Sequence, residues 1–242
     1  MAASGDHLSK QYDQELESMR SRILQMGGLV ESQMRTALEA FERADVALAD
    51  AAIAADRRVN EMEIELDRMV NHLIFRRQPT AGDLRMIMGV AKAIVDIERI
   101  GDESSKIARA AKWLREKSTS FRLNRIPDLL ASGKIAHEML RGALDAFARM
   151  DPVAAAEIIR EDDSVDERFR AILRQLATFV MEDPRSISAS IDAIWAAKAI
   201  ERIGDHAKNI AEHVIFIARG ADVRHVSPEE LQRAVAAAGS ER

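Results

Sequence analysis

Hydrophobic residues recur at helical spacing along most of the chain, with charged and polar residues between them. This pattern predicts amphipathic α-helices, because a helix brings residues three and four apart onto one face. Proline and glycine interrupt the pattern at few places, so the helices are expected to be long. Six helices are predicted, over residues 6–43, 46–76, 80–117, 126–149, 152–182 and 185–219.

One connection between helices carries strong capping residues. In "RMDPVA" at 149–154, Asp151 can accept hydrogen bonds from the free N–H groups of the following helix, and Pro152 suits its first position. The stretch "RADVALA" at 43–49 occupies the corresponding place earlier in the chain. Both stretches are therefore predicted to be short turns between helices.

The chain contains an internal repeat. The pentapeptide Glu-Arg-Ile-Gly-Asp stands at 98–102 and again, 103 positions later, at 201–205. "AFERADVALA" at 40–49 likewise corresponds to "AFARMDPVAA" at 146–155. Self-similarity of this kind indicates a duplicated structural unit. The expected fold is all-α, with two tandem, sequence-related three-helix bundles.

The only long stretch without helical period, "KSTSFRLNRIPD" at 117–128, is the expected boundary between the halves. We therefore predict a first bundle over residues 1–120, a second over 121–221, and a polar C-terminal tail over 222–242.

Composition narrows the class of protein. Hydrophobic residues make up 47% and charged residues 31%, which is typical of a globular protein, and the absence of cysteine excludes disulfides and thiolate metal sites. The net charge of −5 offers no basic field for a nucleic acid. Because neither a secretory signal nor an apolar run of about 20 residues is found, a cytoplasmic protein is expected.

The repeated carboxylates fall on an apolar helix face. Glu98 and Asp102 are expected on the same face as Ile87, Met88, Ala91, Ile94 and Val95, and Glu201 and Asp205 on the face of Ile187, Ile191 and Ile194. We expect both faces to meet the bundle core. An ionised carboxylate there requires a raised pKa, a basic partner, a water-filled groove or a bound metal ion.

The preceding helix of each half supplies more oxygen donors. Asp56, Asn60, Glu63 and Asp67 form one ribbon in the first half, and Asp162 and Asp166 correspond to its start in the second. Antiparallel helices could bring these oxygens to one level. Clusters of oxygen ligands suit Mg²⁺, Ca²⁺ or Mn²⁺, and iron or zinc in less selective sites.

Enzymatic signatures are missing from the sequence. It contains no Glu-x-x-His pair for oxygen-activating di-iron chemistry and no glycine-rich phosphate loop, so a non-enzymatic protein is expected. A metal-dependent enzyme or a metal store using the same carboxylates is the alternative. His206 and His213 are interpreted as surface or partner-facing groups, and Trp113 and Trp195 as packing or interface groups.

Several stretches together resemble the PhoU family of bacterial phosphate-signalling regulators. They are "ELESMRSRILQMGGLVESQM" at 15–34, "DRRVNEME" at 56–63, "RRQPTAGDLRMIM" at 76–88 and the two Glu-Arg-Ile-Gly-Asp copies, and the likeness continues to "DVRHV" at 222–226. The resemblance implies six helices in two three-helix bundles. It also implies that an acidic pair with three residues between its members ligates metal clusters in some members.

Carried onto this chain, that signature matches three acidic pairs: Glu98 with Asp102, Glu201 with Asp205, and Asp162 with Asp166. Asp56 with Asn60 departs from it by an amide, and Glu63 with Asp67 offers replacement donors.

The resemblance further implies a negative regulator of the phosphate regulon. Such a protein links the ATPase subunit of the phosphate ABC transporter to a phosphate-sensing histidine kinase and modulates phosphate uptake. It is expected to form a homodimer and to associate with the inner membrane peripherally, only through its partners.

Overall fold

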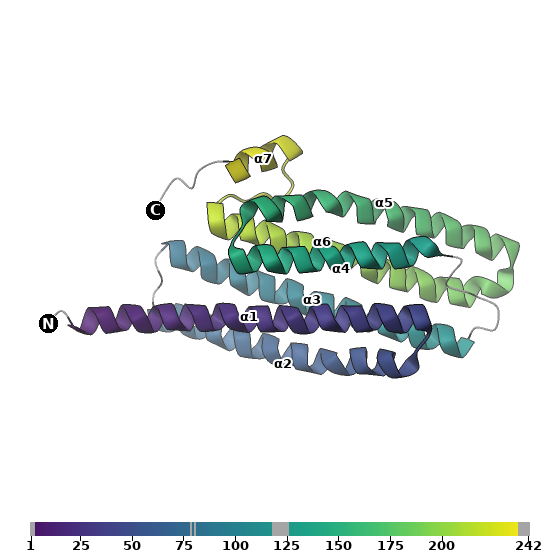
Figure 1. The fold of residues 1–242 in the computed structure, drawn as a ribbon, viewed down its shortest axis with the longest axis horizontal. Coiled ribbons are helices and arrows are strands. Elements are labelled where there is room, and N and C mark those ends of the chain that lie inside the picture. The colour runs from purple at the N-terminus through teal and green to yellow at the C-terminus, as the bar shows by residue number, and fades with distance from the viewer. Residues whose placement is uncertain (1–2, 78, 80, 118–125, 237–242) are drawn as a thin grey trace.

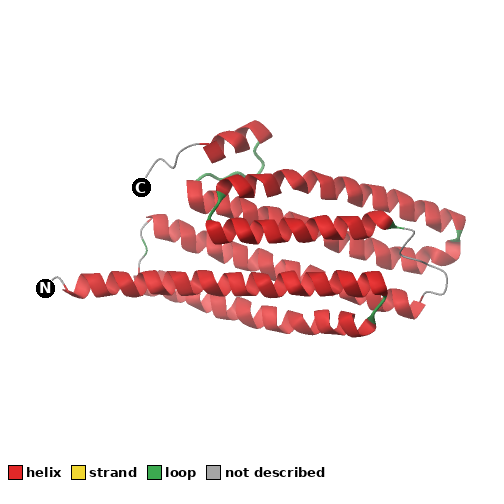
Figure 2. Cartoon of the chain, in the orientation of Figure 1, coloured by secondary structure: helices red, strands yellow, loops and turns green. Residues whose placement is uncertain are grey.

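A computed structural model describes residues 3–77, 79, 81–117 and 126–236, and within these ranges every regular element is a helix (Figures 1 and 2). The predicted all-α fold is thus confirmed, and the six long helices lie within a few residues of their predicted bounds. The elements are α1 (Ala3–Arg43), α2 (Val46–Arg77), α3 (Ala81–Lys117), α4 (Pro127–Arg149), α5 (Pro152–Glu182), the 3-10 turn η2 (Pro184–Ser186), α6 (Ile187–Arg219) and α7 (Pro228–Ala236). The connection predicted to separate the halves falls mainly on 118–125, outside the described residues.

The six long helices lie side by side along one axis (Figure 1). Helices α1 to α3 pack against one another, as do α4 to α6, and each set forms a three-helix bundle. The two bundles contact each other through α3 with α6 and α1 with α4, and in each pair the helices run in opposite directions (Figure 1). None of the described helices has a stretch both long and apolar enough to cross a lipid bilayer.

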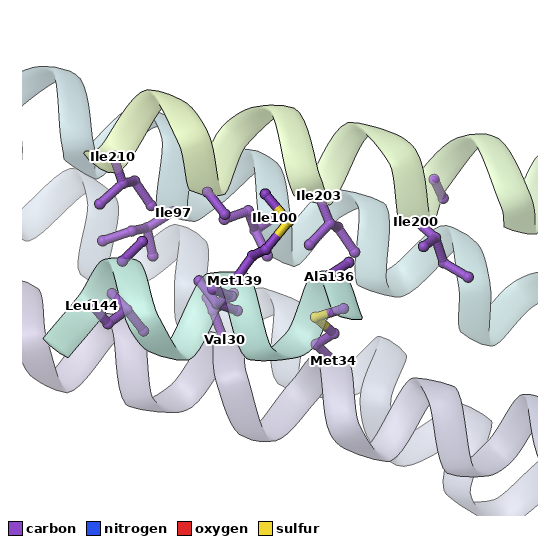
Figure 3. Close-up of a cluster of buried hydrophobic side chains, with 14 of the residues drawn as sticks. Val30, Met34, Ile97, Ile100, Ala136, Met139, Leu144, Ile200, Ile203 and Ile210 are labelled. Atoms are coloured by element: carbon purple, nitrogen blue, oxygen red, sulfur yellow. The ribbon is translucent and has the colours of Figure 1, made fainter. Parts of the chain in front are cut away.

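A single apolar core extends through both bundles. At its centre Val30 of α1, Ile97 of α3, Met139 of α4 and Ile203 of α6 pack together, and none is more than 1% exposed (Figure 3). Burial of apolar surface is the dominant favourable term in folding. The two halves therefore stabilise each other and also hold α3 and α6 in fixed register.

The helix cap predicted at Asp151 is formed, and an equivalent cap at Asp45 occurs at the turn predicted in the first half. Asp151 Oδ1 accepts hydrogen bonds from the backbone N–H groups of Val153 at 3.0 Å and Ala154 at 3.1 Å, and α5 begins at Pro152 as expected. Asp45 does the same at the start of α2, where its Oδ1 accepts from Ala47 N and Leu48 N at 2.8 and 3.1 Å. The two halves therefore share the same cap hydrogen bonds as well as the repeated sequence.

The region predicted as a polar tail contains α7, which packs on α5 and α6. Its Leu231 is buried, as is Val223 in the preceding loop. Ser227 and Glu230 form a reciprocal capping box, in which Ser227 N donates to Glu230 Oε2 at 2.8 Å and Glu230 N donates to Ser227 Oγ at 3.2 Å. The motif Ser-Pro-Glu-Glu at 227–230 is the sequence signal that the prediction overlooked.

Candidate metal centre

Only part of the apolar face that carries the repeated carboxylates points into the core, so the prediction that the whole face is buried was wrong. Ile87 and Ile94 are buried as expected, but Met88 is 42% exposed. In α6 the equivalent Ile191 is 47% exposed. The buried side of α3 and of α6 is therefore turned away from the carboxylates. The carboxylates lie at the edge of the buried side, along the groove between α2 and α3 in the first half and between α5 and α6 in the second.

In the second half, three carboxylates converge across the groove between α5 and α6. One oxygen each of Asp166, Glu201 and Asp205 lies within 4.8 Å of the other two. Asp166 and Glu201 are half-buried, and Asp205 is exposed. Among the described residues this is the one group of three such ligands with that spacing. Oxygen ligands alone suit hard cations such as Mg²⁺, Ca²⁺ or Mn²⁺.

The electrostatics of this triad favour a bound cation. Desolvation and the neighbouring charges of Glu201, Asp162 and Asp166 raise the pKa of Asp205 to about 6, although Lys198 acts in the opposite direction. Like charges held together disfavour ionisation, whereas a cation among them would favour it. The donor set therefore fits a metal ion in its chemistry and in its charge.

Two lysines already neutralise part of the second groove. Lys198 Nζ lies 2.6 Å from both carboxylate oxygens of Glu201. Lys208 Nζ lies 2.7 Å from Oδ2 of Asp162, which is buried. Asp162 thus has a basic partner and stands beside the triad, while Lys198 competes with any cation for Glu201.

In the first half, α2 and α3 also face each other with carboxylates. Desolvation and the charges of Asp102 and Glu63 raise the pKa of Glu98. Desolvation and the nearby charge of Asp67 raise the pKa of Glu63 as well. Arg99 is the basic counterpart here, with its Nε 3.7 Å from Glu98 Oε2 and its Nη1 3.9 Å from Asp102 Oδ2.

A buried glutamine organises the back of this first groove. The Nε2 of Gln33 in α1 lies 3.3 Å from Asp56 Oδ1 and 3.1 Å from both Gly101 O and Ser105 Oγ, which share its two N–H groups. The Oε1 of Gln33 and the Oδ1 of Asn60 are both buried and accept no hydrogen bond from any residue that the structure describes. Buried oxygens in this state are available to a water molecule or an ion.

Gln33 was not singled out in the sequence, although a signal exists. It interrupts the buried stripe of α1, between Val30 and Ala37. A polar residue at a core position needs a partner, and here that partner set includes a candidate ligand, Asp56.

The ten predicted ligands are thus divided between two grooves. The first contains Asp56, Glu63, Asp67, Glu98 and Asp102, with Asn60 one helical turn after Asp56 on α2, and the second contains Asp162, Asp166, Glu201 and Asp205. Three of the four in the second groove form the triad.

A second polar cluster joins α3 to α6 and was not predicted. Asp96 is buried, and its Oδ1 lies 2.8 Å from His206 Nδ1 and accepts from Asn209 Nδ2 at 3.0 Å. Its Oδ2 lies 2.9 Å from His213 Nε2. The prediction that His206 and His213 are surface or partner-facing groups was wrong, because both bind a carboxylate of the other half.

Comparison with family profiles and with known proteins identifies relatives of this fold. The profile of the PhoU domain matches residues 23–111 and again 129–214. The chain is 44% identical over 229 residues to a phosphate-specific transport system accessory protein PhoU homolog of Pseudomonas aeruginosa, covering 95% of this chain and 94% of the relative. It is 42% identical over 236 residues to the accessory protein PhoU of Escherichia coli K12, covering 98% and 97%.

Solved structures agree with the sequence matches. The crystal structure of PhoU from Pseudomonas aeruginosa superposes with a TM-score of 0.84 over 87% of this chain and 100% of that chain, at 44% identity. The phosphate transport system regulatory protein PhoU from Streptococcus pneumoniae gives a TM-score of 0.79 over 88% and 99%, at 26% identity.

Each half of this chain therefore holds one PhoU domain, as the internal repeat predicted. The relatives are regulatory and accessory proteins of phosphate transport, and the family is non-enzymatic. The chain belongs to the PhoU family of phosphate-specific transport system accessory proteins.

Proposed function

We propose that this protein is a negative regulator of the phosphate regulon. It acts as a non-enzymatic adaptor between the ATPase subunit of the phosphate ABC transporter and a phosphate-sensing histidine kinase, and it modulates phosphate uptake. The observation that carries the proposal is similarity over nearly the whole chain to proteins named for phosphate-specific transport. A regulator must contact other proteins, and a rigid helical scaffold with distinct faces suits that task.

The same proposal gives the protein its place in the cell. It works in the cytoplasm as a homodimer at the inner membrane, which it reaches only through its partners. The acidic net charge of −5 supports protein partners rather than nucleic acid.

The carboxylate grooves are proposed to bind divalent or transition metal ions such as Mg²⁺, Mn²⁺, iron or zinc. Support comes from the triad of Asp166, Glu201 and Asp205 and from the orphaned oxygens of Gln33 and Asn60. A cation in either groove would bridge two helices of one bundle. Metal binding would then stabilise each bundle and set the surface that a partner meets.

The regulatory proposal is tested by deleting the gene and measuring phosphate-regulated gene expression in excess phosphate. We expect derepression, and its reversal by the wild-type gene supplied on a plasmid. Unchanged expression in the deletion strain, together with loss of a hydrolytic or redox activity, would contradict the adaptor function.

A further inference from the structure

The face formed by α3 and α6 carries exposed apolar side chains in an arrangement that the internal repeat makes nearly symmetrical. Leu84 and Met88 of α3 correspond, 103 positions later, to Ile187 and Ile191 of α6. All four are more than one third exposed. An exposed apolar surface of this kind commonly marks a site of interaction.

The symmetry fails at one pair of positions. At one end of the face, Lys92 Nζ of α3 lies 5.5 Å from the ring centre of Phe216 of α6. At the other end the equivalent positions are occupied by Trp195 and Trp113, and the space beside them is open. A cleft of about 280 Å³ lies there, and Trp195, one of its lining residues, is 61% exposed. We call it the tryptophan cleft.

Basic side chains surround the tryptophan cleft. Besides the two tryptophans and Ala199, its lining consists of Lys106, Arg109, Lys198, Arg202 and Glu103. The buried Glu103 binds both Lys106 and Arg202, at 2.8 and 3.0 Å, so a single carboxylate serves two cations. Arg109 forms no ion pair with any residue that the structure describes. Lys198 is paired with Glu201, so the four cations meet two carboxylates, and the cleft keeps an excess of positive charge over an apolar floor.

The size and charge of the cleft restrict its occupant. At about 280 Å³ the cleft lies at the lower end of the range for ligand pockets, and it has room for one or two side chains of a protein segment. A second copy bound about a two-fold axis through this cleft would bring two basic rims together, which like charges oppose. The excess of cations instead complements carboxylates.

We propose that the tryptophan cleft docks an acidic segment of a partner protein, which inserts an apolar side chain between Trp113 and Trp195 and places carboxylates against Arg109 and its basic neighbours. The inference rests on the proposed adaptor function, for which it supplies a contact surface. Tryptophan and arginine are the residues most enriched where interface contacts are strongest.

Intrinsic fluorescence tests the cleft directly, because Trp113 and Trp195 are the only tryptophans in the chain. The probe is a synthetic peptide with a Leu-Phe pair flanked by Asp and Glu and without Trp or Tyr, and its control has Lys in place of the acidic residues. We expect a saturable change in tryptophan emission with the acidic peptide only, weakened by added salt. An absent response, or an equal response to both peptides, would overturn the proposal.

Charge reversal supplies matched variants that leave both tryptophans in place. Arg109→Glu should weaken acidic-peptide binding on the order of tenfold or more, whereas Arg57→Glu, at an exposed position of α2, should leave it unchanged. Circular dichroism establishes that each variant is folded. Equal peptide affinity of the Arg109→Glu variant and the wild type would contradict a charge-guided cleft.

Capture of full-length partners separates this inference from the proposed function. Immobilised wild-type protein is expected to retain the transporter ATPase subunit or the kinase, and the Arg109→Glu variant to lose one of them. If the variant retains both like the wild type, the cleft proposal fails and the adaptor function stands. If the wild type retains neither partner and gene deletion leaves phosphate regulation unchanged, the adaptor function fails, and the peptide titration still tests the cleft.

Light scattering tests whether a second copy of the chain occupies the cleft. A dimer that is present in the wild type and lost only in Trp195→Ala would assign the cleft to a second copy and overturn the proposal.

Discussion

Asp96 Oδ1 in α3 lies 2.8 Å from His206 Nδ1 in α6, and these two residues join the halves of the chain through a buried polar contact. His213 and Asn209 complete the set of donors around the same carboxylate. The contact stands on the α3–α6 interface, between the two bundles. It therefore stabilises the packing of one bundle against the other rather than either bundle alone.

Replacing Asp96 by Ala is predicted to lower the free energy of unfolding by about 3 kcal/mol. The change removes the carboxylate and leaves His206, His213 and Asn209 without their acceptor inside the interface. Removing one member of a buried polar pair is costly because the other member stays away from water. Urea denaturation followed by circular dichroism measures the difference. The neighbouring Val95→Ala, at an exposed position, is the matched control and should change stability by less than about 0.5 kcal/mol. Similar losses in both variants would show that the carboxylate has no special part in stability.

The same carboxylate predicts a specific dependence of stability on pH. Desolvation raises the pKa of Asp96, but hydrogen bonds from His206, His213 and Asn209 outweigh it and lower the pKa to about 2. A depressed carboxylate pKa contributes stability that is fully present above the unfolded value of 3.8 and is lost as the pH falls toward 2.

The measurement compares urea denaturation of the wild type and Asp96→Asn between pH 7 and pH 2.5. The stability difference between the two proteins is expected to be constant from pH 7 to about pH 4.5 and then to shrink as the pH falls further. A difference that persists unchanged to the lowest pH would mean that Asp96 has the same pKa in the folded and the unfolded protein, so that its hydrogen bonds do not lower the pKa.

Metal content tests the carboxylate grooves. Asp102→Ala and Asp205→Ala each remove a predicted ligand, one per groove, and each should lower the metal bound per chain after incubation with Mn²⁺ and desalting, as read by elemental analysis. Asp163→Ala removes an equal charge from an exposed position beside the second groove and should retain the wild-type content. Unaltered content in both groove variants would mean that arginine, lysine and water suffice to balance these carboxylates.

The helices and their caps could be predicted because their signals are local. Asp151 followed by Pro152 is a local signal for a helix start, and the repeat placed a turn at the corresponding stretch 43–49, where Asp45 forms the cap. The orientation of the carboxylate face could not be predicted in the same way. Helices α3 and α6 each carry a buried apolar stripe and an exposed one, and Met88 and Ile191 look in sequence like core residues.

The polar contact between the halves was missed for a related reason. Asp96 stands between Ile94 and Ile97 in a buried stretch, which is a visible signal of a partnered carboxylate. Its partners lie more than a hundred positions later in the chain. Only the packing of the two bundles brings them together, and the repeat gives no hint because the position equivalent to His206 is Glu103.

Gly101 and Gly204 occupy equivalent positions of the repeat, next to the two grooves. The repeat predicts that replacing either glycine by alanine changes the free energy of unfolding equally, whereas the structure predicts different changes. A Cβ at Gly204 would lie 3.5 Å from Val165 Cγ1, an ordinary contact, so Gly204→Ala should raise the free energy of unfolding by about 0.5–1 kcal/mol through the higher helix propensity of alanine. A Cβ at Gly101 would lie 3.2 Å from Oε1 of Gln33, whose amide is fixed by hydrogen bonds, so the crowding should cancel or reverse that gain. Thermal and urea denaturation of the two variants, measured with the wild type, should rank Gly204→Ala as the most stable protein. Equal stabilisation by both alanines would show that Gln33 is free to move and that the first groove is less rigid than its hydrogen bonds indicate.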